Sequence, residues 1–136
     1  MLVEIPRTHA SPDIPQITAE EAFAAARAVI VLFEKWGLTD AVARDVLGGL
    51  SPRTYARWKA GDHKHITRDQ ATRLSLLMGV HKGLRSLFKD PRRGYAWMTK
   101  PNDIFGGRTP AEIMAQGDMF SLARIRSYLD AERGGC

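Results

Sequence analysis

The sequence has one cysteine, Cys136, and no long hydrophobic segment, and both absences narrow the class of protein. A single cysteine excludes an intramolecular disulfide. The longest strongly apolar stretch, residues 22–33, contains Arg27 and is far shorter than the roughly 20 residues of a membrane span. The first residues also lack the basic start and apolar block of a secretory signal. We therefore expect a cytoplasmic protein that does not contact a membrane.

Residue sets that carry catalysis or hold metals are missing as well. The glycine pairs at 48–49 and 106–107 lack the companion residues of a nucleotide-binding fingerprint. Ser51 and Ser121 have no evident His and Asp companions. Acidic or cysteine partners at metal-ligand spacing are absent around the four histidines, at positions 9, 63, 65 and 81. We therefore predict a protein that is not an enzyme and uses neither a cofactor nor a metal.

Strand signals do not occur, whereas the start and stop signals of helices recur along the chain. There is no run of alternating β-branched residues. Thr18 and Glu21 have the spacing of a capping box. Ser51-Pro52 and Thr109-Pro110 each place a cap before a first-turn proline. We predict an all-α helical bundle with helices over residues 18–36, 39–47, 51–59, from 67 to either 79 or 88, 91–98, from 109, and 118–130.

The positions of the prolines divide the predicted chain into three parts. Residues 1–17 hold three prolines without periodicity and are expected to form a flexible arm. Residues 18–89 are expected to form a domain with a helix-turn-helix unit. Residues 90–136 are expected to form a small helical domain, because Pro91 marks a boundary. The last helix is expected to carry an apolar stripe formed by Phe120, Leu122, Ile125 and Leu129.

The formal net charge of +5 is concentrated in the middle of the chain. Residues 1–50 have four Lys and Arg against seven Asp and Glu, a net charge of −3. Residues 51–100 have twelve against three, a net charge of +9, and residues 101–136 have four against five, a net charge of −1. A concentrated positive surface attracts nucleic acid, because each phosphate contact releases counterions. The middle third is therefore the expected DNA-binding region.

Residues 38–60 have the size and punctuation of a helix-turn-helix unit, with a Gly48-Gly49-Leu50 turn between two short helices. In the second helix, Tyr55 and Trp58 are three residues apart and share a face that can pack on the core. The other face is basic and would enter the major groove, where the fork of Arg can bond guanine edges. An ordinary helical hairpin with a charged exterior is the alternative. The expected contacts with operator DNA are Arg53, Thr54, Arg57, Lys59 and Lys64, with His63 and His65 near the DNA backbone.

The C-terminal third contains a more specific motif. Residues 97–110 read Trp-Met-Thr-Lys-Pro-Asn-Asp-Ile-Phe-Gly-Gly-Arg-Thr-Pro. This segment resembles the W-L-x-x-P-N-x-x-L-G-G-x-T-P signature of the toxin-binding domain in the Xre/MbcA/ParS antitoxin family. Met98 and Phe105 replace Leu, and both replacements are apolar. Residues 51–55 resemble the helix-turn-helix of the same family, so that the resemblance covers residues 20–136.

The motif residues also have structural roles that follow from their chemistry. Pro101-Asn102 is expected to turn the chain, because Pro fixes φ and Asn tolerates turn conformations. Gly106-Gly107 permits backbone angles that other residues avoid. Thr109-Pro110 is expected to cap and begin a helix. We therefore interpret the motif as a scaffold that presents a surface, with Arg108 as its most exposed contact.

The resemblance implies a cognate toxin of the RES-domain type, which consumes NAD or transfers ADP-ribose from it. In this family the C-terminal segment of the antitoxin can enter the active site of the toxin and block it. Here that segment would be the loose end that starts at Arg133, because a guanidinium matches the phosphates of the substrate. A frayed end without a role is the alternative, and Cys136 is smaller than the bulky final residue that we expect. The expected toxin contacts are Arg108, Arg126, Arg133, Gly134, Gly135 and Cys136.

Two other functions compete with the antitoxin hypothesis. The chain would be a stand-alone transcriptional regulator if its C-terminal domain served only for dimerisation, and a small enzyme is the third possibility. DNA recognition by helix-turn-helix proteins uses paired half-sites, so that we expect a homodimer within a larger toxin–antitoxin complex. The apolar faces of residues 19–36 and 118–130 are the candidate pairing surfaces.

Overall fold

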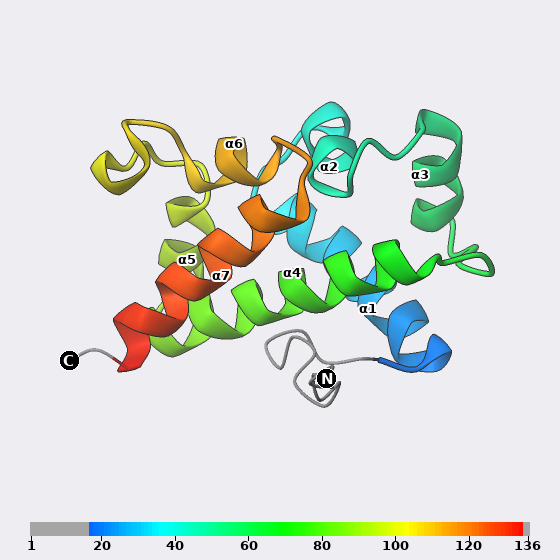
Figure 1. Ribbon diagram of the computed structural model, residues 1–136, viewed down its shortest axis with the longest axis horizontal. Helices are drawn as coiled ribbons and strands as arrows, with labels where there is room; N and C mark the ends of the chain where they lie inside the picture. The colour runs from blue at the N-terminus through cyan, green and yellow to red at the C-terminus, as the bar shows by residue number, and fades with distance from the viewer. Residues whose placement is uncertain (1–16, 135–136) are drawn as a thin grey trace, which may run out of the picture.

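The computed structural model describes residues 17–134, and the regular elements of this part of the chain are all helices (Figure 1). These residues form no strand, and the β-type pairing among them is a single isolated bridge between Asn102 and Arg108. The all-α prediction is therefore confirmed. The elements are α1 (Ala19–Lys35), α2 (Asp40–Val46), α3 (Pro52–Lys59), α4 (Arg68–Leu87), α5 (Pro91–Trp97), the 3-10 helix η2 (Asp103–Phe105), α6 (Pro110–Met114) and α7 (Met119–Gly134).

The predicted capping residues start these helices in the structure. The side chains of Thr18 and Glu21 exchange hydrogen bonds with each other's backbone N–H groups at 3.1 and 2.9 Å. The Ser51 hydroxyl accepts from the N–H of Thr54 ahead of Pro52. Each cap satisfies backbone N–H groups that have no partner inside the helix. The helix starts could be predicted because capping depends on residues close together in the sequence.

Helix α4 is the central element, and it continues through Gly79 to Leu87. Figure 1 shows it running along the length of the molecule, with α7 crossing it at one end. The glycines allow this crossing to be close. A Cβ at Gly83 would lie 2.9 Å from the Cβ of Leu129, and one at Gly79 would lie 2.7 Å from Nε of Arg126. Gly79 therefore lies inside the helix and allows close packing. Of the two predicted ends, residue 79 or residue 88, the second is correct to within one residue.

The core lies between α4 and the two long helices packed against it. Leu74, Leu77 and Val80 of α4 are fully buried together with Phe33 of α1 and Ile125 of α7. Burial of such side chains is the main stabilising contribution in a domain of this size.

One residue of the predicted apolar stripe on α7 does not belong to this core. Leu122, Ile125 and Leu129 are buried, whereas Phe120 is 84% exposed. Phe120 precedes Leu122 by two residues, and a separation of two places side chains on different sides of a helix. The prediction that Phe120 shares one stripe with these three residues is therefore wrong.

His81 gives the fold a pH dependence near neutrality. The imidazole is half-buried, and its Nδ1 has no hydrogen-bond partner within the described residues. Burial lowers the pKa of His81 from 6.5, and the cations Arg85 and Lys35 lower it further. The unfolded chain therefore takes up more protons than the folded chain as the pH falls below about 6.5, so that acidification favours unfolding.

We expect the free energy of unfolding to decrease as the pH falls from 7 to 5, and His81→Gln to flatten this decrease. Urea unfolding of both chains across that range measures the effect. Hydrogen bonds from Thr18 and Thr109 also lower the pKa values of the capping carboxyls Glu21 and Glu112, but from an ordinary value of 4.5. Their contribution is therefore lost at lower pH than that of His81. Parallel curves for His81→Gln and the parent chain would contradict the assignment.

Candidate functional sites

The turn between α2 and α3 depends on two glycines with positive φ. Gly48 and Gly49 have φ of +88° and +85°, a region that other residues rarely adopt. Leu50 then returns to the core, and Ser51 caps α3. The turn therefore fixes the direction in which α3 leaves α2.

Helix α3 has one buried face and one exposed basic face, as predicted. Tyr55 and Trp58 are 4% and 3% exposed. Arg53 and Arg57 are exposed and lie one helical turn apart, and their guanidinium groups make no hydrogen bond or ion pair with residues 17–134. The hydroxyl of Thr54 accepts a hydrogen bond from Ser51 at 3.0 Å, which ties Thr54 to the cap. The structure thus brings Arg53 and Arg57 together as a pair of exposed guanidinium groups.

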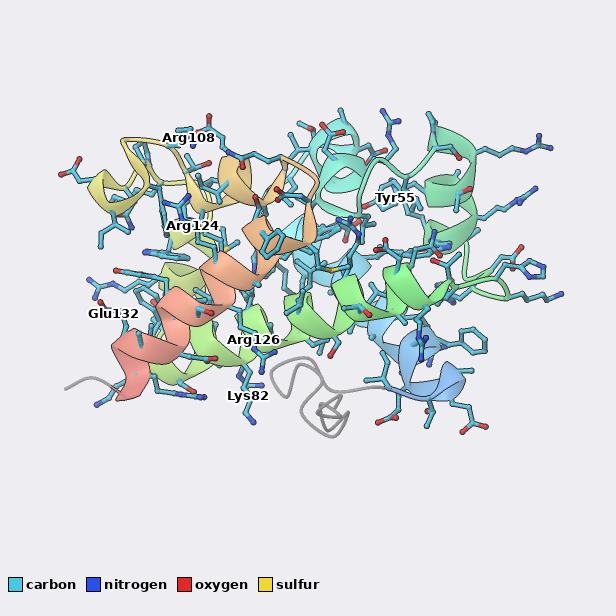
Figure 2. All side chains as sticks on the ribbon, viewed as in Figure 1. Tyr55, Lys82, Arg108, Arg124, Arg126 and Glu132 are labelled. Carbon is cyan, nitrogen blue, oxygen red and sulfur yellow. The ribbon has the colours of Figure 1, made fainter. Side chains whose placement is uncertain are left out.

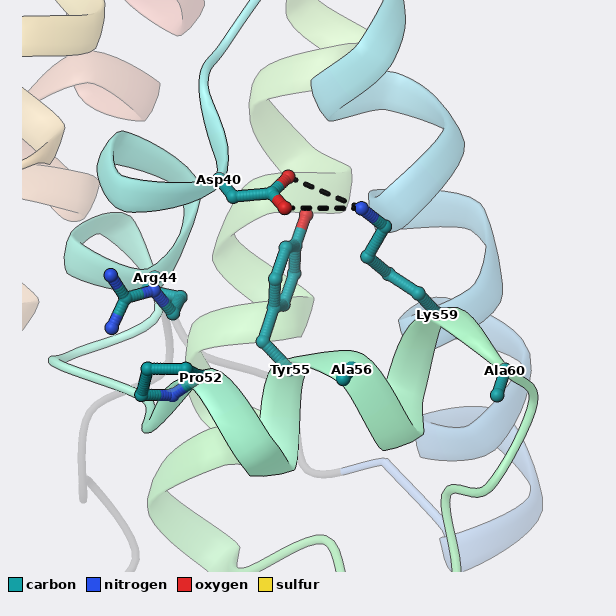
Figure 3. Close-up of a pocket in the computed structure, with 7 residues that line it drawn as sticks. All are labelled: Asp40, Arg44, Pro52, Tyr55, Ala56, Lys59 and Ala60. Carbon is teal, nitrogen blue, oxygen red and sulfur yellow. Dashed lines mark hydrogen bonds and ion pairs between the residues drawn. The ribbon is translucent and has the colours of Figure 1, made fainter.

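Lys59 points toward Asp40 at the start of α2 (Figure 3). Its Nζ lies 3.2 Å from both carboxylate oxygens of Asp40 and 5.6 Å from the centre of the Tyr55 ring. Burial, with the nearby Asp40 and Glu34 charges, raises the pKa of Tyr55 to about 12, so that its hydroxyl stays neutral. An exposed ion pair contributes about 1 kcal/mol or less. We interpret the Asp40–Lys59 pair as a tie between α2 and α3.

The three basic residues of the loop after α3, at positions 63–65, differ in burial. His63 is 5% exposed, its Nε2 lies 3.0 Å from the backbone oxygen of Trp58, and its ring meets the Trp58 ring edge-on. The expectation that His63 approaches DNA is therefore wrong, because its ring fills the end of the core. Lys64 and His65 are exposed, as is Arg68 at the start of α4. Sequence reasoning missed Arg68, which follows the cap of the next helix.

Arg73 in α4 connects the helix-turn-helix unit with the C-terminal region. Its Nε donates to Asp69 at 2.8 Å, and its Nη1 donates to the backbone oxygen of Gly117 at 2.7 Å, in the turn between α6 and α7. The guanidinium also lies against Gly48, where an added Cβ would come within 2.7 Å of its Cζ. The Arg73 side chain is 11% exposed. One buried cation therefore contacts the α2–α3 turn, α4 and the α6–α7 turn.

We expect Arg73→Met to reduce the free energy of unfolding by about 1–3 kcal/mol, because it leaves the part-buried Gly117 carbonyl without its charged donor. Arg68→Met is the matched control. Arg68 is exposed in the first turn of the same helix, where a cation is slightly unfavourable. Urea unfolding monitored by circular dichroism measures both variants. Equal stabilities for the two would show that Arg73 is not a structural tie.

The motif at residues 97–110 folds into a compact loop held by its own backbone. The N–H groups of Asn102 and Gly107 donate to the backbone oxygens of Arg108 and Asn102 at 3.1 and 3.0 Å. Gly106 and Gly107 have φ of +68° and +84°, as their place in the motif predicts. The Asn102 side chain accepts from the N–H of Ile104. These residues build the scaffold, and Arg108 is exposed on it.

Aromatic side chains join this loop to α7. The rings of Trp97 and Tyr128 stack with centroids 6.0 Å apart and an interplanar angle of 5°. Phe105 meets Tyr128 edge-on at 5.5 Å, and the guanidinium carbon of Arg124 lies 5.2 Å from the Phe105 ring centre. Sequence reasoning missed this cluster and Arg124. The spacing of Arg124 and Tyr128, four residues apart on one helix face, was the available signal.

The arginines expected to contact the toxin do not lie on one surface in the structure. Figure 2 shows Arg108 and Arg124 on the side of α7 that faces the motif loop, and Arg126 on the opposite side toward α4. Arg126 is half-buried, and its Nε lies 3.7 Å from Asp130.

The end of the chain is more regular than we expected. Arg133 and Gly134 continue α7, and Arg133 lies 3.4 Å from Asp130. The expectation of a loose end from Arg133 is therefore wrong for these two residues, because the helix extends past the last buried side chain, Leu129. Gly135 and Cys136 lie outside the described residues.

Within residues 17–134, none of the helices has the length and apolar character of a membrane span. Groups of three or more potential metal ligands are also absent from this part of the chain.

Comparison with known proteins assigns both halves of the chain. Residues 15–79 match the antitoxin Xre-like helix-turn-helix domain, and residues 83–135 match the antitoxin Xre/MbcA/ParS C-terminal toxin-binding domain. The chain is also 33% identical over 126 residues to the uncharacterized protein y4oB of Sinorhizobium fredii, a match that covers 92% of each chain. Both matched domains are binding domains rather than enzymes, with DNA and a toxin as their partners. The chain therefore belongs to the Xre/MbcA/ParS family of antitoxins.

Proposed function

We propose that this antitoxin neutralises a RES-domain toxin by placing its C-terminal segment in the active site of that toxin. The observation that carries the proposal is the exposed last turn of α7, which contains Arg133. All residues after Asp130 in the described part are exposed, and this turn lies inside the match to the toxin-binding domain. A helix end without core contacts can enter a cleft at little cost to the fold.

Arg133 is the side chain best suited to occupy that cleft. A guanidinium binds phosphate oxygens in pairs, and NAD carries two linked phosphates. The contact of Arg133 with Asp130 is a surface ion pair, so that exchanging it for a toxin site costs little. Gly134, Gly135 and Cys136 would follow into the cleft. In this proposal Arg108 contacts the toxin outside the active site, and Arg126 supports α7 from the α4 side.

We further propose that the α3 surface binds operator DNA as part of a homodimer, which represses the operon of the antitoxin. Arg53 and Arg57 would read bases and Lys64 would contact the DNA backbone, while Thr54 and Lys59 would position α3 through their contacts with Ser51 and Asp40. In the proposed division, residues 18–89 carry the DNA function and residues 90–136 carry the toxin function. Paired half-sites explain why two copies would be needed.

The proposal is tested by measuring NAD consumption by the purified product of the neighbouring toxin reading frame. Adding the full chain in equal amounts should stop NAD consumption and restore growth when both genes are expressed together. A chain that binds operator DNA in a gel shift but leaves the toxin active would favour the stand-alone regulator. A chain that does neither would overturn both parts of the proposal.

A further inference from the structure

The described residues expose three large hydrophobic side chains, and two of them lie in the toxin-binding domain. Ile104 is 56% exposed and Phe120 is 84% exposed, whereas Val31 in α1 is 48% exposed. Single exposed apolar side chains are common on protein surfaces, whereas a group of them beside charged side chains marks an interaction site. Ile104 and Phe120 are therefore informative as parts of one surface.

Each of these two side chains belongs to an element that contributes a ring to the aromatic cluster, Ile104 to η2 and Phe120 to α7. Phe120, Arg124 and Tyr128 are spaced four residues apart, so that they form one ridge along α7. Arg124 lies over the Phe105 ring, and Ile104 precedes Phe105 in the motif loop. Figure 2 places Arg108 and Arg124 on this same side of α7. We call the exposed set the anchor surface: Ile104, Arg108, Phe120 and Arg124.

We propose that the anchor surface is where the toxin docks first, separately from the segment that blocks its active site. This inference rests on the proposed function and names a second part of the same interface. Its partner would be a toxin surface with an apolar recess for Phe120 and Ile104, edged by Asp or Glu side chains that meet Arg108 and Arg124. Aromatic and Arg side chains contribute most of the binding energy in protein interfaces.

The structure supports the anchor surface from beneath, which favours tight docking. The stack of Trp97 on Tyr128 and the edge contacts of Phe105 hold α7 against the motif loop. Thr109 and Glu112 fix the end of that loop through a capping box. A surface that is ordered before binding loses less entropy on binding.

A second copy of the chain fits this surface less well than a partner surface with acidic side chains would. A two-fold pairing sets the same patch against itself, which would bring Arg108 and Arg124 toward their own copies. Neither side chain has a hydrogen bond or ion pair to any residue among 17–134. Opposite charges on the partner would therefore gain two contacts, whereas like charges would repel.

The test measures affinity for the purified, catalytically inactive toxin by surface plasmon resonance. We expect Ile104→Ala with Phe120→Ala, and separately Arg124→Glu, to weaken binding at least about tenfold. Val31→Ala, which removes an exposed apolar side chain from α1, should change the affinity less than about threefold. Circular dichroism checks that each variant is folded, which is expected because the replaced side chains are exposed.

The outcomes separate this inference from the proposed function. Unchanged affinity in the anchor variants, with the parent chain binding and inhibiting the active toxin, would overturn the anchor surface alone. Loss of self-association in sedimentation without loss of toxin affinity would assign the surface to a second copy and overturn it too. A parent chain that binds no toxin would overturn both proposals.

Discussion

Removal of residues 133–136 should give a folded chain that still binds the toxin but no longer inhibits it. Leu129 is the last fully buried side chain of α7, so that the shortened helix keeps all of its core contacts. The anchor surface is also intact in this variant. The lost guanidinium and terminal residues would leave the active site open to NAD. We expect the concentration for half-inhibition of NAD consumption to rise about 100-fold or more, since losing a buried charged contact costs a few kcal/mol.

Two controls define what the truncation removes. Arg133→Ala in the full chain tests the guanidinium separately from the chain end and should account for most of the loss. Deletion of residues 1–14, which precede both matched domains, should leave inhibition unchanged. If the chain without residues 133–136 inhibited the toxin as strongly as the parent, the blocking segment would lie elsewhere in the domain.

The features that sequence reasoning predicted correctly depend on local chemistry. Capping pairs such as Thr18 with Glu21 involve residues three positions apart, and the positive φ of Gly106 and Gly107 follows from their place in a tight loop. The two faces of α3 follow from helical periodicity alone. Such features need no knowledge of what packs against them.

The features that it missed depend on tertiary contacts. His63 looks like a polar loop residue, but it is buried because the chain turns back on Trp58. Lys59 looks like part of the basic face, yet Asp40, nineteen residues earlier, draws its amine toward α2. The role of Arg73 depends on Gly117, which lies 44 residues away in the chain. Periodicity cannot identify partners at these separations.

The same distinction explains the arginines of α7. All of them are plausible contacts on a basic helix, but Arg126 faces Gly79 of α4 while Arg124 faces the motif loop. The sequence shows that they differ in direction by about 160°, because two residues span roughly 200° of helix. The sequence does not show which of the two side chains is covered. In the structure α4 crosses α7 on the Arg126 side and covers that side chain.

Replacing both Arg53 and Arg57 by Ala should abolish specific operator binding under conditions where the parent chain binds tightly. Each guanidinium lies on the exposed basic face of α3, and a bidentate contact with a guanine edge contributes about 1–3 kcal/mol. We therefore expect the operator affinity to fall at least about 100-fold in the double variant. Gel shifts with operator DNA and with unrelated DNA of equal length measure the change, because lost base contacts reduce the difference between the two.

The matched control removes two positive charges at the other end of the molecule. Arg92 and Arg93 are exposed on α5, which lies far from α3 along the molecule (Figure 1). The Arg92→Ala, Arg93→Ala chain has the same net charge as the α3 variant, so that any general electrostatic attraction falls equally in both. If the two double variants lost operator affinity to the same extent and with the same salt dependence, α3 would contribute charge but no recognition. A loss confined to the α3 variant, larger for operator than for unrelated DNA, would assign sequence reading to Arg53 and Arg57.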